Sequence, residues 1–189
     1  MNFNIKTERL FLRELCISDV NSLYQLMSDN KITKYLTWLP HTNIDTTKAV
    51  VQGLIDAQKN DKGYHWCICW NNEIIGLISL IDVRRKIRTW TLNRAELSYW
   101  IGTNFQGKGF ATEACRNLIE FGFKNLDLHK IIVGHASRNV ESKKICEKLN
   151  FLQYAYEHDA FQKDNKWNDL IWYELIKDNY EMDKEGTNF

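Results

Sequence analysis

A glycine-rich stretch at residues 104–115, NFQGKGFATEAC, carries the clearest chemical signal in the sequence. Gly107 and Gly109 flank Lys108, and good helix formers follow directly. When a strand runs into such a turn and then into a helix, free backbone N–H groups and the positive end of the helix dipole converge on one anion. The stretch therefore predicts a phosphate-binding turn, and a glycine-rich helix cap without a ligand is the alternative.

Two better-known nucleotide-binding loops do not fit this spacing. A P-loop has a four-residue gap between its glycines and then a Lys followed by Ser or Thr, whereas Lys108 lies between two glycines. The dinucleotide fingerprint needs a third glycine, and Thr112 stands at that position. Both loops are therefore excluded by position.

Hydrophobic periodicity predicts the elements that must position this turn. The order is a strand, two helices, three strands, a helix, a strand, a helix and two strands, which predicts one α/β layer with helices on its faces. Residues 84–90, RRKIRTW, are expected to form a basic loop. The predicted strands are 9–15, 64–70, 73–83, 94–101, 129–137, 151–161 and 166–176, and the predicted helices are 18–29, 44–60, 109–126 and 139–150.

Composition and charge limit the function classes. The 189 residues are 44% hydrophobic, which indicates a globular chain with a packed core. The net charge is +1, so no long-range attraction to nucleic acid or to an anionic membrane is expected. The N-terminus lacks a signal-peptide pattern, which favours a cytoplasmic protein. Five cysteines without a CxxC pair predict neither a disulfide framework nor a metal site, and Cys67 and Cys69 are expected to be packing thiols.

The motif Gln106-x-x-Gly109-x-Ala111, followed by Asn139-x-x-Ser142 at the start of a predicted helix, resembles the GNAT superfamily of acetyl-coenzyme A dependent N-acetyltransferases. The most similar branch is the RimJ/RimL type, which acetylates protein N-termini. Further matching segments are TERLFLREL, WLP, AELSYWI and NDLIWYEL, in the family's order from about residue 6 to about residue 180.

The resemblance implies a fold and a cofactor. The fold is one GNAT-type domain over residues 1–189, with a mobile tail at about 181–189. Its mostly antiparallel sheet of six or seven strands splays at the cofactor site and has helices on both faces. The cofactor is acetyl-CoA, with no metal, and the glycine-rich turn holds its pyrophosphate. The implied cofactor-binding residues are Tyr99, Ile101, Gln106, Gly107, Lys108, Gly109, Phe110, Ala111, Thr112, Asn139 and Ser142.

Acetyl transfer to an amine needs a base, because a free α-amino group has a pKa near 8. Glu96 is the candidate, since it stands in the otherwise apolar strand RAELSYWI, where burial would raise its pKa. The alternative is an exposed Glu96 paired with Arg94. The oxyanion is expected to meet a backbone N–H at a bulge around residues 99–101, with the pantetheine arm pairing along the same edge.

The leaving thiolate also needs a proton donor. Many family members carry a Tyr four residues after the position of Ser142, but here that residue is Cys146, which is expected to be in the core. RimL-like proteins lack that Tyr in the same way, so the resemblance implies Ser142 as the donor. The alternative for Ser142 is a local role in the first helical turn. Asn139 is expected both to cap its helix and to contact the pantetheine amide.

The acceptor is expected to meet aromatic side chains in or near loops, namely Tyr35, Trp38, His41 and Trp167. Such aromatic side chains suit a protein N-terminus, of ribosomal-protein type in view of the resemblance, or a small amine such as an amino sugar, an antibiotic or a polyamine. The alternative from another functional class is a coenzyme A binding module that has no catalytic activity. Exposed aromatics suit a pocket or a dimer face equally, which leaves a homodimer open.

Overall fold

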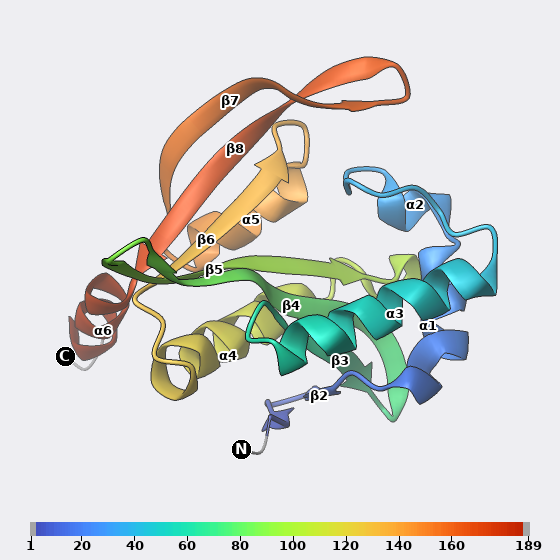
Figure 1. Cartoon of the computed structure of the whole chain (residues 1–189), viewed down its shortest axis with the longest axis horizontal. Helices are drawn as coiled ribbons and strands as arrows, with labels where there is room; N and C mark the ends of the chain where they lie inside the picture. The colour runs from blue at the N-terminus through green and yellow to red at the C-terminus, as the bar shows by residue number, and fades with distance from the viewer. Residues whose placement is uncertain (1–2, 187–189) are drawn as a thin grey trace.

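The computed structural model describes residues 3–186 and shows one mixed sheet with helices packed on it (Figure 1). All neighbouring strands are antiparallel except β5 and β6. In spatial order the strands are β1 (Ile5–Lys6), β2 (Phe11–Glu14), β3 (Tyr64–Trp70), β4 (Glu73–Ile87), β5 (Trp90–Ile101), β6 (Lys130–Ala136), β8 (Lys166–Ile176) and β7 (Leu152–Lys163). The predicted mostly antiparallel sheet is confirmed, with eight strands instead of six or seven.

The four predicted helices are present in the predicted order, with short helical turns between the elements and one further helix at the C-terminal end of the described residues. The 3-10 turn η1 (Ile17–Asp19) leads into α1 (Val20–Met27), and α2 (Asn30–Thr33) is one short turn before α3 (Ile44–Lys59). The turn η2 (Thr103–Phe105) precedes α4 (Phe110–Asn125), and α5 (Val140–Lys148) follows β6. Residues 181–186, expected in a mobile tail, belong to α6 (Lys177–Gly186), and 187–189 lie outside the described residues.

Hairpins join β3 to β4, β4 to β5 and β7 to β8. Asn71 and Asn72 join β3 to β4 with φ of 49° and 65°, the left-handed pair that a two-residue turn requires. The expected loop at 84–90 is wrong, because β4 runs to Ile87 and β5 begins at Trp90. The basic side chain of Arg85 is accommodated by an ion pair with Asp61 (2.9 Å), so the strand need not end there.

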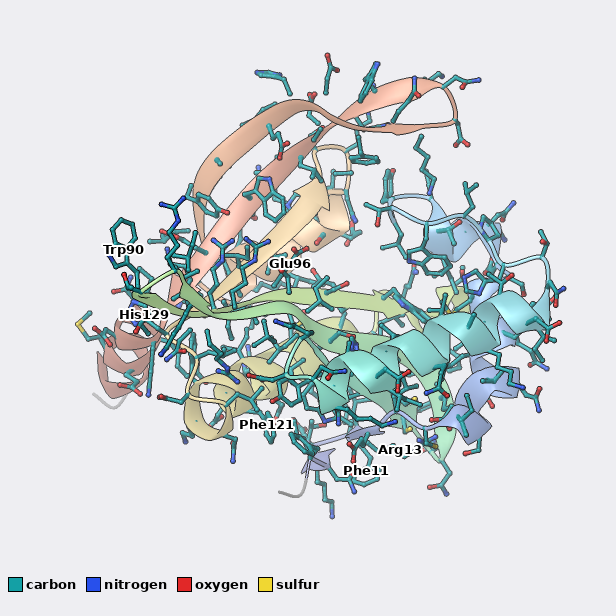
Figure 2. All side chains as sticks on the ribbon, viewed as in Figure 1. Phe11, Arg13, Trp90, Glu96, Phe121 and His129 are labelled. Carbon is teal, nitrogen blue, oxygen red and sulfur yellow. The ribbon has the colours of Figure 1, made fainter. Side chains whose placement is uncertain are left out.

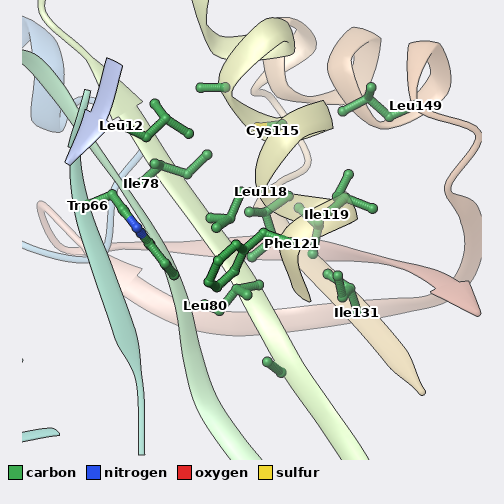
Figure 3. Close-up of a cluster of buried hydrophobic side chains, with 14 of the residues drawn as sticks. Leu12, Trp66, Ile78, Leu80, Cys115, Leu118, Ile119, Phe121, Ile131 and Leu149 are labelled. Atoms are coloured by element: carbon green, nitrogen blue, oxygen red, sulfur yellow. The ribbon is translucent and has the colours of Figure 1, made fainter. Parts of the chain in front are cut away.

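Two hydrophobic cores lie on opposite faces of the sheet. On one face, α4 covers β4 to β6, and its buried Leu118, Ile119 and Phe121 pack against Leu80 and Ile131 (Figure 3). On the other face, α1 and α3 cover a smaller core built on β3 and β4. The buried thiols follow this division: Cys67 and Cys69 lie in the smaller core, as predicted, and Cys115 and Cys146 in the larger one.

None of the helices within residues 3–186 is long and apolar enough to cross a membrane.

Candidate active site

The sheet opens into a notch between β5 and β6. The two parallel strands pair over three rungs only, and the last rung joins Glu96 to Ile132. Beyond it β5 continues to Ile101 and β6 to Ala136 without pairing to each other. The facing backbone edges therefore offer N–H and C=O groups to an extended ligand, as strand addition requires. The predicted splay is confirmed.

The bulge expected at residues 99–101 is absent from the register of β5. Its pairing with β4 is unbroken from Glu96, opposite Ile81, to Ile101, opposite Gly76. The irregular steps come between Ile81 and Arg84 and between Arg84 and Lys86. An N–H for the oxyanion is thus available from the unpaired edge of β5 that faces the notch, without a bulge.

The glycine-rich turn begins directly after β5 and η2. Gly107 and Gly109 have φ of +73° and +80°, a region that residues with a Cβ rarely adopt. Gly109 is the N-cap of α4 without a side-chain cap, so the first amides of the helix have no partner within it. A Cβ on Gly107 would meet nothing within 4 Å, which leaves the turn open to a ligand. The local geometry fits a pyrophosphate held by backbone amides.

Neighbouring side chains brace this turn. Gln106 donates a hydrogen bond from Nε2 to the carbonyl of Ile101 (2.9 Å), which ties the turn to the end of β5. The ammonium of Lys108 lies 5.5 Å from the ring centroid of Phe105 and 5.9 Å from that of Trp70. Phe110 is only 3% exposed, so it can offer a ligand its backbone N–H but not its ring. Ala111 and Thr112 follow in the first turn of α4, and both are half-buried.

Arg9 is a residue of this site that sequence reasoning missed. Its Nη1 donates to the carbonyl of Lys108 (3.0 Å), and its Nε pairs with Glu113 (2.7 Å) in the first turn of α4. The guanidinium also lies 4.8 Å from the ring centroid of Phe110. Arg9 is the first residue of the predicted strand 9–15, and the local sequence there shows its charge but gives no sign of its distant partners Lys108 and Glu113.

Glu96 lies where β5 and β6 diverge (Figure 2). Burial raises the pKa of its carboxyl, the nearby charge of Asp82 raises it further, and Arg94 opposes the shift. Within the described residues Glu96 takes part in no ion pair, so the alternative of a pair with Arg94 is not realised. A partly buried carboxylate with a raised pKa suits a general base.

Ser142 and Tyr99 form a hydrogen-bonded pair beside the notch. Ser142, 8% exposed, lies 2.8 Å through its Oγ from the phenol oxygen of Tyr99. Burial raises the pKa of Tyr99 well above its usual value, with Cys115 and Cys146 adding to the shift, so the phenol stays neutral. Asn139 caps α5 by accepting a hydrogen bond from the N–H of Ser142 (3.2 Å), which confirms its predicted cap role.

Glu96 and the Ser142–Tyr99 pair lie on opposite faces of β5. Alternate residues of a strand point to opposite sides, and Leu97 and Tyr99 face the larger core under α4. Glu96 shares the other face with Trp100, which packs in the smaller core. An amine could therefore lose its proton on one side of the notch while the leaving sulfur accepts a hydrogen bond on the other.

Two of the predicted acceptor residues form an aromatic wall. Trp38 lies 5.4 Å from the ring of His41 and 6.1 Å from Trp100 on β5. His41 is 8% exposed and shares a 2.8 Å hydrogen bond with Thr47. Burial lowers the pKa of His41, so this wall is uncharged at neutral pH. Trp100 belongs to β5, which borders the notch, and its ring packs against Trp38, so it connects the aromatic wall to the notch.

The other two predicted acceptor residues lie nearer the surface. Tyr35 is half-buried, and the ammonium of Lys34 is 4.9 Å from its ring centroid. Trp167 is 58% exposed near the end of the β7–β8 hairpin, opposite Gln162. Sequence reasoning missed Lys163, whose ammonium links this hairpin to the segment around Trp38.

Two surface hollows lie away from the notch. One of about 330 Å³ lies between α3 and the edge of the sheet and is lined in part by Leu54 and Tyr64. The other, of about 560 Å³, lies between α5, β8 and α6 and is lined in part by Phe151 and Ile176. Neither includes Glu96. Across residues 3–186 the structure holds no group of three His, Cys, Asp or Glu side chains placed to bind a metal ion.

A family model described as an acetyltransferase (GNAT) domain matches residues 9–152, which include the notch, the turn and both members of the Ser142–Tyr99 pair. The chain belongs to the GNAT acetyltransferase family. It is an acyltransferase of the RimJ/RimL-like type that uses acetyl-CoA to acetylate an amine.

Individual relatives agree on this chemistry and differ in their acceptors. An uncharacterized N-acetyltransferase, p20 of Bacillus licheniformis, is 30% identical over 92% of this chain and 96% of its own length. Spermidine N(1)-acetyltransferase of Vibrio cholerae is 24% identical over 91% of this chain and 95% of its own. The solved structure of RimL, a ribosomal L7/L12 alpha-N-protein acetyltransferase in complex with coenzyme A, superposes with a TM-score of 0.85 at 23% identity, over 92% of this chain and 97% of that one.

Proposed function

We propose that the acceptor is the free α-amino group of a protein N-terminus, with a ribosomal protein as the expected class. The observation that carries this proposal is the state of the carboxylates near the notch. Glu157 accepts a hydrogen bond from the indole of Trp172 (2.9 Å), Glu174 is paired with Lys130, and Asp82 is paired with Arg84. Glu96 takes part in no such interaction among residues 3–186. One available base matches an acceptor that presents one amine.

The proton balance supports an α-amine. Its pKa of about 8 lies closer to neutral pH than the value of about 10.4 for a lysine amine, so a carboxylate with a moderately raised pKa can remove its proton. Glu96 accepts that proton on one face of β5. On the other face, the Ser142 hydroxyl donates a hydrogen bond to the leaving thiolate, supported by the neutral phenol of Tyr99 2.8 Å away, and coenzyme A takes its proton from solvent as it is released.

The same residues fit the cofactor. Bound acetyl-CoA supplies the activated acetyl group as a thioester. The amides at Gly107, Gly109 and the first turn of α4 would hold its pyrophosphate, because the turn is open and its glycines have positive φ. The unpaired edges of β5 and β6 would pair with the pantetheine arm, and Asn139 and Ser142 would lie at its reactive end.

The acceptor wall disfavours a polycation. The segment from Asn30 to Ile44, which carries Trp38 and His41, contains Lys31 and Lys34 but no Asp or Glu. A polyamine with several positive charges would need several free carboxylates along its path. Because one relative is a spermidine N(1)-acetyltransferase, a polyamine is the second candidate acceptor, and the test below includes spermidine.

The test is coenzyme A release, followed with a thiol reagent across N-terminal peptides, spermidine, an aminoglycoside and an amino-sugar nucleotide. We expect turnover with unblocked peptides and none with the same peptides acetylated at their N-terminus. Turnover with spermidine alone would overturn the proposed acceptor. Binding of acetyl-CoA without release for any amine would instead favour the non-catalytic module.

A further inference from the structure

The far end of the β7–β8 hairpin is fastened to the segment that follows α2 by one side chain. Lys163, the last residue of β7, donates hydrogen bonds from its ammonium to the carbonyls of Thr33, Leu36 (2.7 Å) and Trp38 (3.3 Å). A lysine ammonium has three donors, and all three are used here. In Figure 1 this end of the hairpin curves toward α2, away from the body of the sheet.

The hairpin presents this ammonium in a fixed place. Asp164 and Asn165 have φ of 51° and 59°, the left-handed pair of a tight two-residue turn. Lys163 therefore lies opposite Lys166 on the last rung, and Gln162 lies opposite Trp167 on the rung before it. The exposed Trp167 is thus one rung away from the fastening point.

The segment after α2 depends on the same contact. The helix α2 is a single turn, so the carbonyls at its end have no helical partners of their own. The carbonyl of Thr33 also accepts from the N–H of Leu36 (2.9 Å), and no strand pairs with residues 34–43. Three carbonyls that converge on one ammonium give this segment, and with it Trp38, a defined place.

An ordinary surface lysine would not be held in this way. Its usual partners are water or a carboxylate, whereas these acceptors are three backbone carbonyls from residues more than 120 positions away in the chain. The side chain of Lys163 is half-buried, and burial lowers its pKa. The contact joins the two segments that carry Trp38 and Trp167, both expected on the acceptor side.

We propose that Lys163 is a positioning residue that holds together the two sides of the acceptor site, the segment after α2 and the end of the β7–β8 hairpin. We call this contact the latch. With the latch closed, the acceptor must reach Glu96 between the segment after α2 and the hairpin, which favours an amine on a narrow, extended chain. The latch thus sets acceptor affinity and selectivity without touching the reacting atoms. This inference rests on the proposed function, because it assigns the acceptor to this side of the notch.

The first test needs no acceptor. Hydrogen exchange measured by mass spectrometry should show faster exchange at residues 33–41 and 160–168 together in Lys163→Met, with α4 and α5 unchanged. Lys166→Met, across the same rung, is the matched control and should leave both segments unchanged. Lys163→Arg keeps donors and should restore much of the protection. Lys163→Gln provides a second variant if Lys163→Met does not fold.

The second test measures selectivity. Losing charge-assisted hydrogen bonds should raise KM for the peptide acceptor about tenfold, while kcat and the Kd of coenzyme A change little. Exchange that rises evenly along the chain, rises in neither segment, or rises equally in Lys166→Met would overturn the latch. If none of the peptides makes the wild-type protein release coenzyme A, while Lys163→Met still exchanges faster in both segments, the proposed acceptor is contradicted and the Lys163 contact stands.

Discussion

At the scale of single residues, burial raises the pKa of both Glu96 and Tyr99, so both side chains hold a proton more readily than they would in water. The partly buried carboxyl of Glu96 holds a proton more readily than a glutamate in water, because ionisation there is penalised. Tyr99 is buried as well, and its phenol resists ionisation, so it remains a donor near Ser142. The more basic carboxylate of Glu96 can accept a proton at neutral pH, and the neutral phenol of Tyr99 can keep its hydrogen bond with Ser142.

Glu96→Gln should lower kcat/KM by roughly 10² or more, the usual effect of losing a general base. The loss should be largest at lower pH, where unprotonated amine is scarce. The readout is coenzyme A release with a peptide acceptor between pH 6 and 9, with Ser98→Ala on the same face of β5 as the control. Unchanged activity in Glu96→Gln would refute its role as base.

The same substitution should stabilise the fold at neutral pH. The raised pKa means that the folded state keeps this proton when the unfolded chain has lost it, so stability falls as pH rises through that interval. Glutamine removes the penalty, and the gain should vanish below the usual pKa of a glutamate. Chemical denaturation of both proteins at pH 7 and pH 4 measures it, and equal stability at pH 7 would contradict the burial argument.

Tyr99→Phe should lower kcat less than Ser142→Ala does, because Tyr99 acts through Ser142. The Kd of coenzyme A should change little in Tyr99→Phe, since the turn and α4 are untouched. In the double variant the two effects should be far from additive, as expected for groups that share one hydrogen bond. Additive losses would show that the two hydroxyls act independently.

At the scale of elements, the glycine-rich turn depends on backbone conformation more than on side chains. Gly109 combines a φ of +80° with a close approach of Arg9, whose Nη2 would lie 3.4 Å from an added Cβ. Arg9 in turn holds the carbonyl of Lys108. The turn is thus shaped by its glycines from within and by the N-terminal segment from outside.

Gly109→Ala should weaken coenzyme A binding, because a left-handed alanine costs about 1–2 kcal/mol and the turn must shift to relieve it. Gly53→Ala is the matched control: Gly53 lies inside α3 with nothing within 4 Å of an added Cβ, so it should leave binding unchanged. Isothermal titration with coenzyme A gives both values. Wild-type affinity in Gly109→Ala would contradict the pyrophosphate assignment.

Hydrophobic periodicity predicts the longer helices and strands well. It does not predict side chains whose hydrogen-bond partners lie far along the chain. The seven longer strands were found by alternation and turn residues, whereas the two-residue β1 is too short to show any pattern. The loop expected at 84–90 is wrong because Asp61 pairs with Arg85, so a strand can carry this basic run. Arg9 and Lys163 bind backbone carbonyls far along the chain, which no local motif encodes.

At the scale of the whole molecule, three buried histidines couple the fold to pH. His41, His65 and His135 are each no more than 8% exposed, and burial lowers the pKa of all three. The unfolded chain binds protons at these sites at higher pH than the folded protein does, so stability must fall as the solution is acidified. The fold therefore requires these side chains to be neutral.

The free energy of unfolding should decrease as pH falls from 6.5 to about 4, the interval between the ordinary pKa of His65 and its value in the fold. His65 alone should account for about 3 kcal/mol of this loss. Denaturant titrations across that range measure it. A flat profile for the wild type would contradict the burial of neutral histidines.

The most direct test of the central claim is the position of the acetyl group on a peptide that offers two amines. The peptide carries a free N-terminus and one internal lysine, and its product with acetyl-CoA at pH 7 is mapped by tandem mass spectrometry. We predict acetylation of the α-amino group, abolished in Glu96→Gln. Acetyl on the lysine side chain, or no product while spermidine is acetylated, would contradict the account.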